Sequence, residues 1–260
     1  PVEYCHLRKV SLKSIGLIIV AAIFLFIMAD YVNACSMIAF QNLLDDSLQA
    51  IVNKPVEALV VVAILPAIIE EFLFRGMIYR GIANKSNKKI VIIISALLFA
   101  FLHMNFNQMC YAFVMGLVFA IVIYLTDNLS VSILLHMLFN AFTVIITCFE
   151  KSNAIQAILQ CNIAGYTLFN PSLTDTQGKI EISLLIIGGL IAILSAVIAG
   201  WLILLIAKTE KTTETTINNE NILKDNDNIF KNNENWKPDL RFFAGSGVCI
   251  LIAILYEILL

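Results

Sequence analysis

The sequence predicts an all-α protein, a polytopic transmembrane helical bundle with about seven spans. Of its 260 residues, 60% are hydrophobic and 14% are charged, against about 25% charged residues in an ordinary soluble domain. The mean hydropathy is +0.87, and a soluble fold of this length has too little interior for so much apolar surface. Apolar runs of roughly 17–25 residues, long enough to cross a bilayer, recur along the chain. A membrane β-barrel would instead show strands that alternate apolar and polar residues.

The apolar runs divide the chain in order. Residues 1–208 are predicted to form the membrane bundle, and a polar connector follows the fifth run at 150–179. Residues 209–239 are rich in Asn, Thr, Lys and Glu, a composition typical of a solvated, disordered loop, and residues 240–260 are predicted to form a last transmembrane helix. The expected spans lie near residues 13–33, 55–82, 89–104, 108–126, 129–149, 181–207 and 241–260.

Basic residues give these spans an orientation. With an N-terminus in the cytoplasm, the basic groups before span one, between spans two and three, and after span six all fall on the cytoplasmic side, as the positive-inside rule requires. We therefore expect a multi-pass protein of the cell membrane with a cytoplasmic N-terminus. The residues concerned are Arg8, Lys9, Lys13, Arg80, Lys85, Lys88, Lys89, Lys208 and Lys211.

Charge and cysteine content exclude other classes of protein. The 17 Lys and Arg against 19 Asp and Glu leave a net charge of −2, so no basic surplus favours nucleic acid as a partner. The six cysteines are scattered without a CxxC pair, which predicts free thiols rather than a disulfide framework or a cysteine zinc site. The first apolar run lacks a small-residue cleavage site and is interpreted as a span, not a signal peptide.

A few polar groups lie inside the predicted spans, where ionisable side chains are costly and therefore suggest function. They are Glu70, Glu71, Arg75, His103, His136 and the amide Asn140. Glu70 and Glu71 are adjacent on a helix and point about 100° apart, so we expect them not to face the same partner. Glu71 and Arg75 are four residues apart, which predicts a structural ion pair. Glu70 is then left as a candidate base or metal ligand.

The histidines extend this set. His136 and Asn140 are four residues apart and share a helical face. Either histidine alone fits a hydrogen-bonded core residue, but together with Glu70 and Asn140 they predict one shared site. Distances counted along the helices, at 1.5 Å per residue, allow such a site.

These residues fall in three motifs. EEFLFRG at 70–76 fits EExxxR followed by glycine, FAFLH at 99–103 fits FxxxH, and HMLFN at 136–140 fits HxxxN. In this order, on three apolar segments, they resemble the CPBP family of intramembrane proteases, also called Abi or CAAX-protease-like proteins. The resemblance covers roughly residues 55–150, which would be the catalytic core.

The resemblance implies roles for the motif residues. Glu70 would activate the attacking water, and His103 would bind or orient it. His136 and Asn140 would donate hydrogen bonds to the oxyanion, while Glu71 and Arg75 would support the helix and shape the site. Peptide hydrolysis needs such a base and such donors.

Metal dependence leaves two alternatives. Glu70, His103 and His136 would make a His₂Glu set suited to a catalytic zinc, although the HExxH spacing of zinc proteases is absent. If His136 and Asn140 form the oxyanion hole, His136 is not a ligand. The expectation is therefore chemistry without a metal cofactor, with zinc as the alternative.

Three functions compete. The first is an intramembrane endopeptidase that cuts a membrane-associated peptide or protein within the lipid bilayer. The second is a non-catalytic bacteriocin-immunity or partner-binding protein of the same fold. The third is a proton-relaying transporter, which the lack of paired halves or an inverted repeat disfavours. The composition suits a bacterial protein, so a bacterial membrane peptide is expected as substrate rather than a prenylated protein.

Overall fold

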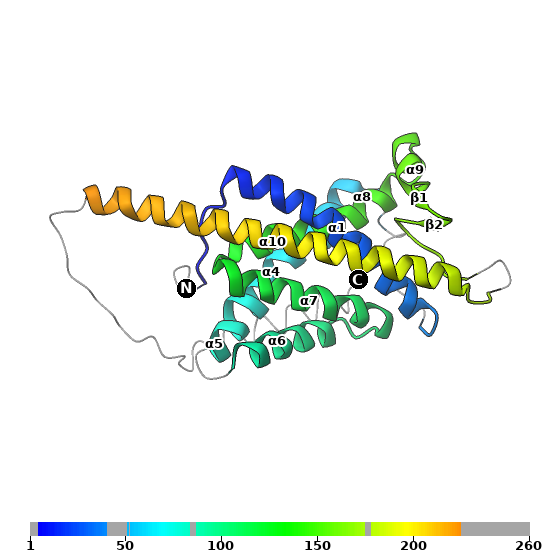
Figure 1. The fold of residues 1–260 in the computed structure, drawn as a ribbon, viewed down its shortest axis with the longest axis horizontal. Helices are drawn as coiled ribbons and strands as arrows, with labels where there is room; N and C mark the ends of the chain where they lie inside the picture. Colours follow the sequence, from blue (N-terminus) through cyan, green and yellow to red (C-terminus); the bar gives the residue numbers. More distant parts are fainter. Residues whose placement is uncertain (1–4, 41–50, 52, 84–86, 175–177, 225–260) are drawn as a thin grey trace.

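The computed structural model describes residues 5–40, 51, 53–83, 87–174 and 178–224, with side chains as far as residue 213. These residues form a helical bundle with one small hairpin at one end (Figure 1). Its longer helices are α1 (Leu12–Met37), α6 (Lys88–Leu102), α7 (Phe106–Thr126), α8 (Leu129–Cys148) and α10 (Ile182–Lys224). The shorter elements are α3 (Pro55–Ala58), η1 (Leu59–Ile64), α4 (Leu65–Glu71), η2 (Phe72–Tyr79), α5 (Arg80–Ala83), α9 (Asn153–Leu159), β1 (Asn162–Ile163) and β2 (Tyr166–Thr167).

Four helices in the described part of the chain are long and apolar enough to cross a membrane: Leu12–Met37, Phe106–Thr126, Leu129–Cys148 and Ile182–Thr213. The prediction of a polytopic helical membrane protein is therefore confirmed. Two other expected spans take a different form, because the run 55–82 is divided into short helices and α6 has only 15 residues. The expected span 241–260 lies outside the described residues.

The helical path from α3 to α5 contains two π-helical segments. η1 and η2 are π-helical segments on either side of α4. Pro66 lies in the first turn of α4 and has no N–H, so it cannot donate to the carbonyl of Val62 four residues earlier. Inserted π-turns of this kind often occur at functional sites, and Glu70 and Glu71 lie at the junction of α4 with η2.

The predicted polar connector and the predicted disordered loop both contain regular structure. The connector 150–179 holds α9 and the β1–β2 hairpin. α10 continues to Lys224, so residues 209–224 of the predicted disordered loop are helical. Figure 1 shows this orange end of α10 extending beyond the other helices. Leucines and isoleucines support the helix through residue 206, after which polar residues continue the same helical path. Residues 225–239 lie outside the described part.

The core lies between α1, α7, α8, α10 and the η2 segment. α1 and α10 pack side by side along much of their length (Figure 1). The outer face of α10 remains uncovered: Leu190 is 63% exposed and Leu194 is 60% exposed. Such large apolar side chains on an outer face suit contact with lipid tails rather than water.

Candidate active site

Antiparallel packing of the α3–α5 path against α8 brings Glu70 and Glu71 next to His136. Ser132 Oγ on α8 donates to Glu71 Oε2 at 2.6 Å. Two turns further along α8, Asn140 Nδ2 donates to the carbonyl of Val62 at 3.2 Å. Asn140 thus donates a hydrogen bond to the carbonyl that Pro66, lacking an N–H, cannot bond. Two side chains of one face of α8 therefore fix the height of the glutamates relative to His136.

Glu71 and Arg75 form the predicted ion pair, which is confirmed. Arg75 Nη1 donates to Glu71 Oε1 at 2.9 Å, and both side chains are 0% exposed. Arg75 Nη2 also donates to the carbonyl of Gly116 on α7 at 2.8 Å. The guanidinium carbon lies 4.5 Å from the ring centroid of Phe99, a favourable cation–π distance. The bundle therefore compensates the charge of Arg75 at both terminal nitrogens and through the ring of Phe99.

His136 lies between the two glutamates. Its Nδ1 is 3.1 Å from Glu71 Oε1, and its Nε2 is 3.9 Å from Glu70 Oε2. The expectation that Glu70 and Glu71 cannot face the same partner is therefore wrong. The physical reason is that the two nitrogens of an imidazole lie at different edges of the ring, so one ring meets two carboxylates that diverge from the helix axis.

The protonation of His136 follows from this contact. Glu71 accepts hydrogen bonds from Arg75 and Ser132 and is therefore an ionised acceptor. His136 must then carry its proton on Nδ1 and donate it to Glu71. The ring stacks on Phe119, with centroids 4.7 Å apart and planes at 20°. This stacking holds Nε2 in the direction of Glu70.

His103 joins the cluster through an aromatic side chain. It follows the last turn of α6, and its Nδ1 lies 3.0 Å from the carbonyl of Phe99, an acceptor that fixes the proton on Nδ1. The ring of Phe99 contacts both histidines, at centroid distances of 5.1 Å to His103 and 5.7 Å to His136. Nε2 of His103 is left as the nitrogen that can accept a hydrogen bond from water.

Burial separates the members of the site. Glu71 is fully buried, His136 is 3% exposed and Glu70 is 6% exposed. His103 and Asn140 are partly exposed. The set therefore has an inner, sealed half at Glu71 and Arg75 and a more open half at His103 and Asn140, with Glu70 and His136 between them.

The residues of the zinc alternative can be compared with the arrangement that a metal ion needs. No three His, Cys, Asp or Glu side chains are grouped there in a way that could hold a metal ion. Glu70, His103 and His136, the ligands of the zinc alternative, therefore do not form such a group in this conformation. Nδ1 of each histidine is turned toward protein, His136 to Glu71 and His103 to the carbonyl of Phe99, so Nε2 is the nitrogen of each that could meet a metal.

Sequence reasoning missed several groups that shape the site. Ser132 is the most informative, because it lies four residues before His136 and eight before Asn140, so the three share one face of α8. Extending the HxxxN spacing backward by one step would have found it. Phe99 belongs to the FxxxH motif, yet its place between the histidines depends on packing. The carbonyls of Val62 and Gly116 carry no side-chain signal at all.

Comparisons with known proteins agree with the motifs. Residues 52–142 match the Rce1-like family, which is described as type II CAAX prenyl endopeptidase Rce1-like. A relative from Staphylococcus aureus (strain USA300), the membrane-embedded CAAX protease MroQ, is 34% identical over 116 residues, which cover 42% of this chain and 47% of that protein. The chain thus matches about half the length of this curated relative. No solved structure gives a significant match. The resemblance inferred from the motifs is confirmed, because residues 52–142 match the Rce1-like family and contain all three motifs.

Proposed function

We propose that this protein is an intramembrane endopeptidase that hydrolyses a peptide bond in a membrane-associated peptide or protein. The match of residues 52–142 to a family of endopeptidases supports peptide hydrolysis. The apolar helices support a substrate that is presented at or within the bilayer. Of the residues that this chemistry would use, Glu70 faces His136, Phe99 contacts both His103 and His136, and Asn140 follows His136 by one turn of α8.

The observation that carries the proposal is the unequal environment of two adjacent glutamates. Arg75, Ser132 and His136 all contact the carboxylate of Glu71, which is therefore occupied in holding the bundle. Glu70 is aimed instead at Nε2 of His136, at 3.9 Å. A buried carboxylate that faces an imidazole in this way is suited to take a proton from water. The pair thus divides into a structural and a catalytic member.

In the proposed reaction, Glu70 accepts a proton from a water molecule that His103 Nε2 orients. The resulting hydroxide attacks the scissile carbonyl carbon, and the carbonyl oxygen becomes an oxyanion. Asn140 and Nε2 of His136 donate hydrogen bonds to that oxygen. Because Nδ1 already donates to Glu71, His136 can donate from Nε2 only as an imidazolium. Glu70 then passes its proton to the leaving amine as the C–N bond breaks.

The orientation of the chain in the membrane also belongs to the proposal. Arg8, Arg80 and the 208–211 region lie at the same end of the bundle, because Arg8 and Arg80 contact Asp127 while Glu210 contacts Asn128. This clustering supports a cytoplasmic N-terminus and about seven spans, with the α3–α5 path and α6 as the membrane-embedded wall of the site. The chemistry proposed here uses no metal cofactor.

The substrate proposed is a bacterial membrane peptide, such as a peptide pheromone or a bacteriocin leader. Comparative peptidomics tests the whole proposal in the native host. Strains carrying the wild-type chain, Glu70→Gln or Glu57→Gln at equal expression are compared in their membrane and secreted fractions. Glu57 is an exposed residue of α3 on the same helical path, and its substitution changes the net charge equally.

The expected result is an uncut precursor in the Glu70→Gln strain alone, together with loss of its product. The cut site then identifies the substrate. If all three strains contain the same peptides while the wild-type phenotype persists, catalysis through Glu70 is wrong. The non-catalytic immunity or partner-binding function would then explain the protein better.

A further inference from the structure

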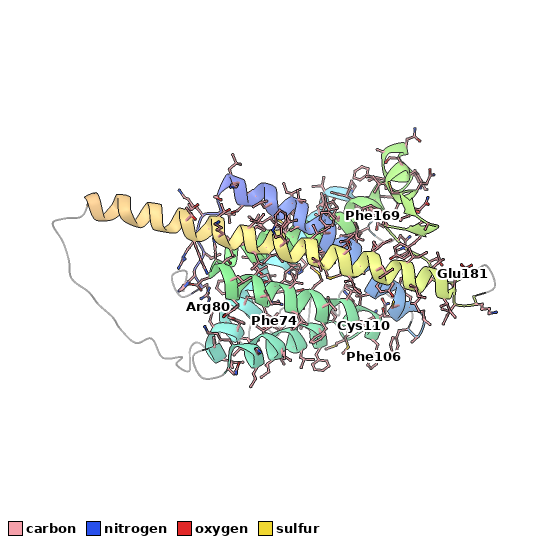
Figure 2. The ribbon with its side chains drawn as sticks, viewed as in Figure 1. Phe74, Arg80, Phe106, Cys110, Phe169 and Glu181 are labelled. Carbon is pink, nitrogen blue, oxygen red and sulfur yellow. The ribbon has the colours of Figure 1, made fainter. Side chains whose placement is uncertain are left out.

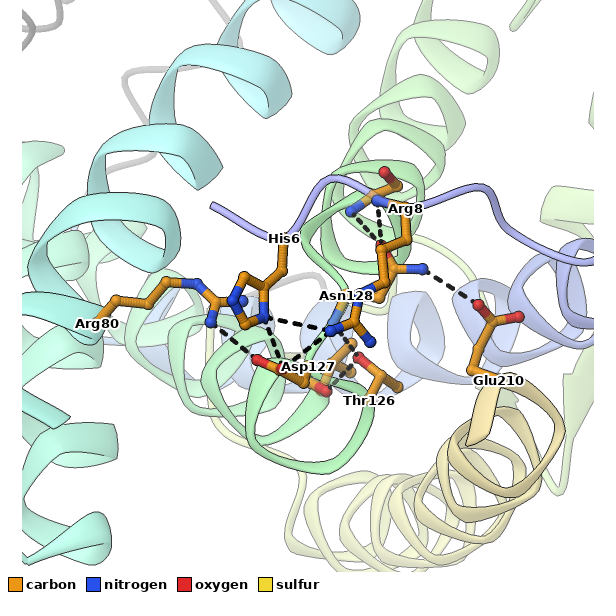
Figure 3. Close-up of polar contacts among 9 residues, drawn as sticks. His6, Arg8, Arg80, Thr126, Asp127, Asn128 and Glu210 are labelled. Carbon is orange, nitrogen blue, oxygen red and sulfur yellow. Dashed lines mark hydrogen bonds and ion pairs between the residues drawn. The ribbon is translucent and has the colours of Figure 1, made fainter. Parts of the chain in front are cut away.

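A second polar cluster lies at the cytoplasmic end of the bundle, where α7 turns into α8 (Figure 3). Only Asp127 and Asn128 separate the two helices. Asp127 has φ 49° and ψ 27°, in the left-handed region that Asp tolerates better than most residues. This backbone conformation makes the turn tight and points two polar side chains at neighbouring elements. Asp127 faces Arg80 and His6, and Asn128 faces Arg8 and Glu210.

The segment before α1, residues 5–11, crosses the start of α8 at this turn. The carbonyl of His6 accepts a hydrogen bond from the backbone N–H of Leu129 at 3.2 Å. The backbone N–H of Arg8 donates to Asn128 Oδ1, also at 3.2 Å. The segment thereby satisfies a donor in the first turn of α8 that has no partner within the helix.

Asp127 joins this segment to the helical path that carries the glutamates. Its Oδ1 accepts from Arg80 Nη1 at 2.8 Å, and its Oδ2 lies 2.6 Å from His6 Nδ1. Arg8 Nη2 approaches the same Oδ2 at 3.4 Å. Arg80 begins α5 directly after η2. One carboxylate therefore links the end of η2, the segment 5–11 and the start of α8.

Cys5 adds an apolar contact to the same linkage. It is 2% exposed and packs on Gly76, where an added Cβ would lie 3.2 Å from Cys5 Sγ and 3.3 Å from Leu129 Cδ2. Gly76 is the residue after Arg75, so Cys5 packs against the backbone that follows the Glu71–Arg75 pair. The absence of a side chain at Gly76 lets Cys5 and Leu129 approach η2 closely.

α10 completes the linkage. The carboxylate of Glu210, 7% exposed, accepts from the backbone N–H of Ser11 at 3.2 Å and from Asn128 Nδ2 at 3.1 Å. Ser11 caps α1. The start of α1, the start of α8 and α10 therefore meet on one buried carboxylate.

We propose that residues 5–11, held by Asp127, form a clamp that fixes the height of η2 against α8 and so positions Glu70 relative to His136. Leu129, where the clamp meets α8, is three residues from Ser132, a rise of about 4.5 Å. Ser132 in turn donates to Glu71. Asp127 and Arg80 are positioning residues, and the proposal rests on the peptidase function proposed above.

Thiol labelling tests the clamp without any reference to catalysis. Replacing Cys35, Cys110, Cys148 and Cys249 with Ala leaves Cys5, the buried first residue of the clamp, and Cys161, exposed at the opposite end. Burial also raises the pKa of the Cys5 thiol. N-ethylmaleimide is added to the full chain in detergent micelles, and alkylation of each cysteine is followed by mass spectrometry. Cys161 serves as the internal reference.

Asp127→Asn is expected to raise the alkylation rate of Cys5 relative to that of Cys161 by up to about fivefold, because loss of a partly exposed ion pair makes local opening of the segment easier. Glu181→Gln changes the net charge equally at the far end of the molecule, where Figure 2 places Glu181 away from Arg80, and is expected to leave the ratio unchanged. An unchanged ratio in Asp127→Asn overturns the clamp, whether or not the Glu70 test supports a peptidase.

Cleavage of the host peptide that accumulates in the Glu70→Gln strain tests positioning. Asp127→Asn is expected to lower kcat by about tenfold to a hundredfold, the scale of a 1 Å misplacement of reacting groups, with KM little changed. Asp127→Glu, which keeps the carboxylate, should recover part of the rate. A change confined to KM, or equal losses in Asp127→Asn and Asp127→Glu, would show that the clamp contributes only to folding. Cleavage by Glu70→Gln itself would instead refute the proposed function.

Discussion

Two ionic clusters lie along the same helical path, one in the middle of the bundle and one at its end. In the middle, Arg75 and Glu71 are 2.9 Å apart and both are 0% exposed. At the end, Arg80 and Asp127 are 2.8 Å apart, but their side chains are 12% and 50% exposed. The two ion pairs have nearly the same length and quite different surroundings.

The two pairs differ in whether water can solvate the charge that remains when one partner is removed. Water can reach Asp127 and solvate a charge left at the end of the bundle. No water reaches Arg75, whose guanidinium is enclosed by Phe99, Phe119 and the carbonyl of Gly116. We therefore expect the middle cluster to determine whether the bundle folds. We expect the end cluster to determine how accurately Glu70 is positioned relative to His136.

The largest effect is expected from Glu71→Gln. Removing one partner of a buried pair leaves an uncompensated charge, which costs about 3–5 kcal/mol. Thermal unfolding of the purified protein in detergent measures this loss, with Glu57→Gln as the control of equal charge change. Equal stability of these two variants would mean that Arg75 finds another partner, and the contrast between the clusters would fail.

A smaller loss of stability is expected from Gly116→Ala. Its added Cβ would lie 3.0 Å from Ala96 Cα and 3.2 Å from Ala96 O, so α6 and α7 must move apart. Overpacking of this kind costs about 1–3 kcal/mol. Gly200→Ala is the matched control, because nothing lies within 4 Å of its added Cβ. Gly200→Ala should be neutral or stabilising, and a loss equal to that of Gly116→Ala would point to a general effect of replacing helical glycines.

Asp127→Asn should change stability by less than about 1 kcal/mol, as is typical of ion pairs that reach the solvent. Burial raises the pKa of Asp127, but the hydrogen bonds and charges of Arg80 and His6 outweigh it and lower the pKa below its ordinary value. A carboxylate of lowered pKa stabilises the fold above its unfolded pKa, about 3.9 for Asp, and this stability is lost as the pH falls through the folded pKa.

The wild-type chain should therefore lose its advantage over Asp127→Asn below about pH 4. Unfolding curves of both proteins between neutral and acidic pH measure the difference. High salt should reduce the same difference at neutral pH, because the pair is exposed enough to be screened. A stability difference between the two proteins that grows as the pH falls would contradict the assignment of Asp127 as an ionised partner of Arg80.

No effect on activity is expected from chelators. If Glu70 activates water without a metal, peptide cleavage should be the same before and after dialysis against EDTA or 1,10-phenanthroline. Metal content of the purified protein is measured in parallel. Loss of cleavage that zinc restores would favour the alternative in which Glu70, His103 and His136 bind a metal.

Local spacing made much of the site predictable. Glu71 and Arg75 are an i, i+4 pair, and His136 and Asn140 share a helical face, so both relations could be inferred from 3.6-residue periodicity alone. The same logic failed for His136 and the two glutamates. That logic assumed that two diverging side chains cannot contact the same residue, whereas an imidazole has two nitrogens at different edges of its ring.

Other features could not be inferred from composition or local spacing. The π-helical segments around Pro66 are compatible with an ordinary helix by composition. The helical continuation at 209–224 overrides a polar composition. Asp127 and His6 are 121 residues apart in sequence, and nothing local marks them as partners. The end cluster therefore could not be predicted from the sequence, because its members are brought together only by the packing of the helices.

The most direct test compares Glu70→Gln with Glu71→Gln. Both variants are purified in detergent, their unfolding temperatures are measured, and each is placed in vesicles with host membrane peptides to detect new peptide ends. We predict that Glu70→Gln unfolds like the wild-type chain and loses about 10²–10⁴-fold in cleavage rate, while Glu71→Gln unfolds at a lower temperature. Cleavage by a folded Glu70→Gln protein, or equal destabilisation of both variants, would contradict the division of the two glutamates into a catalytic and a structural residue.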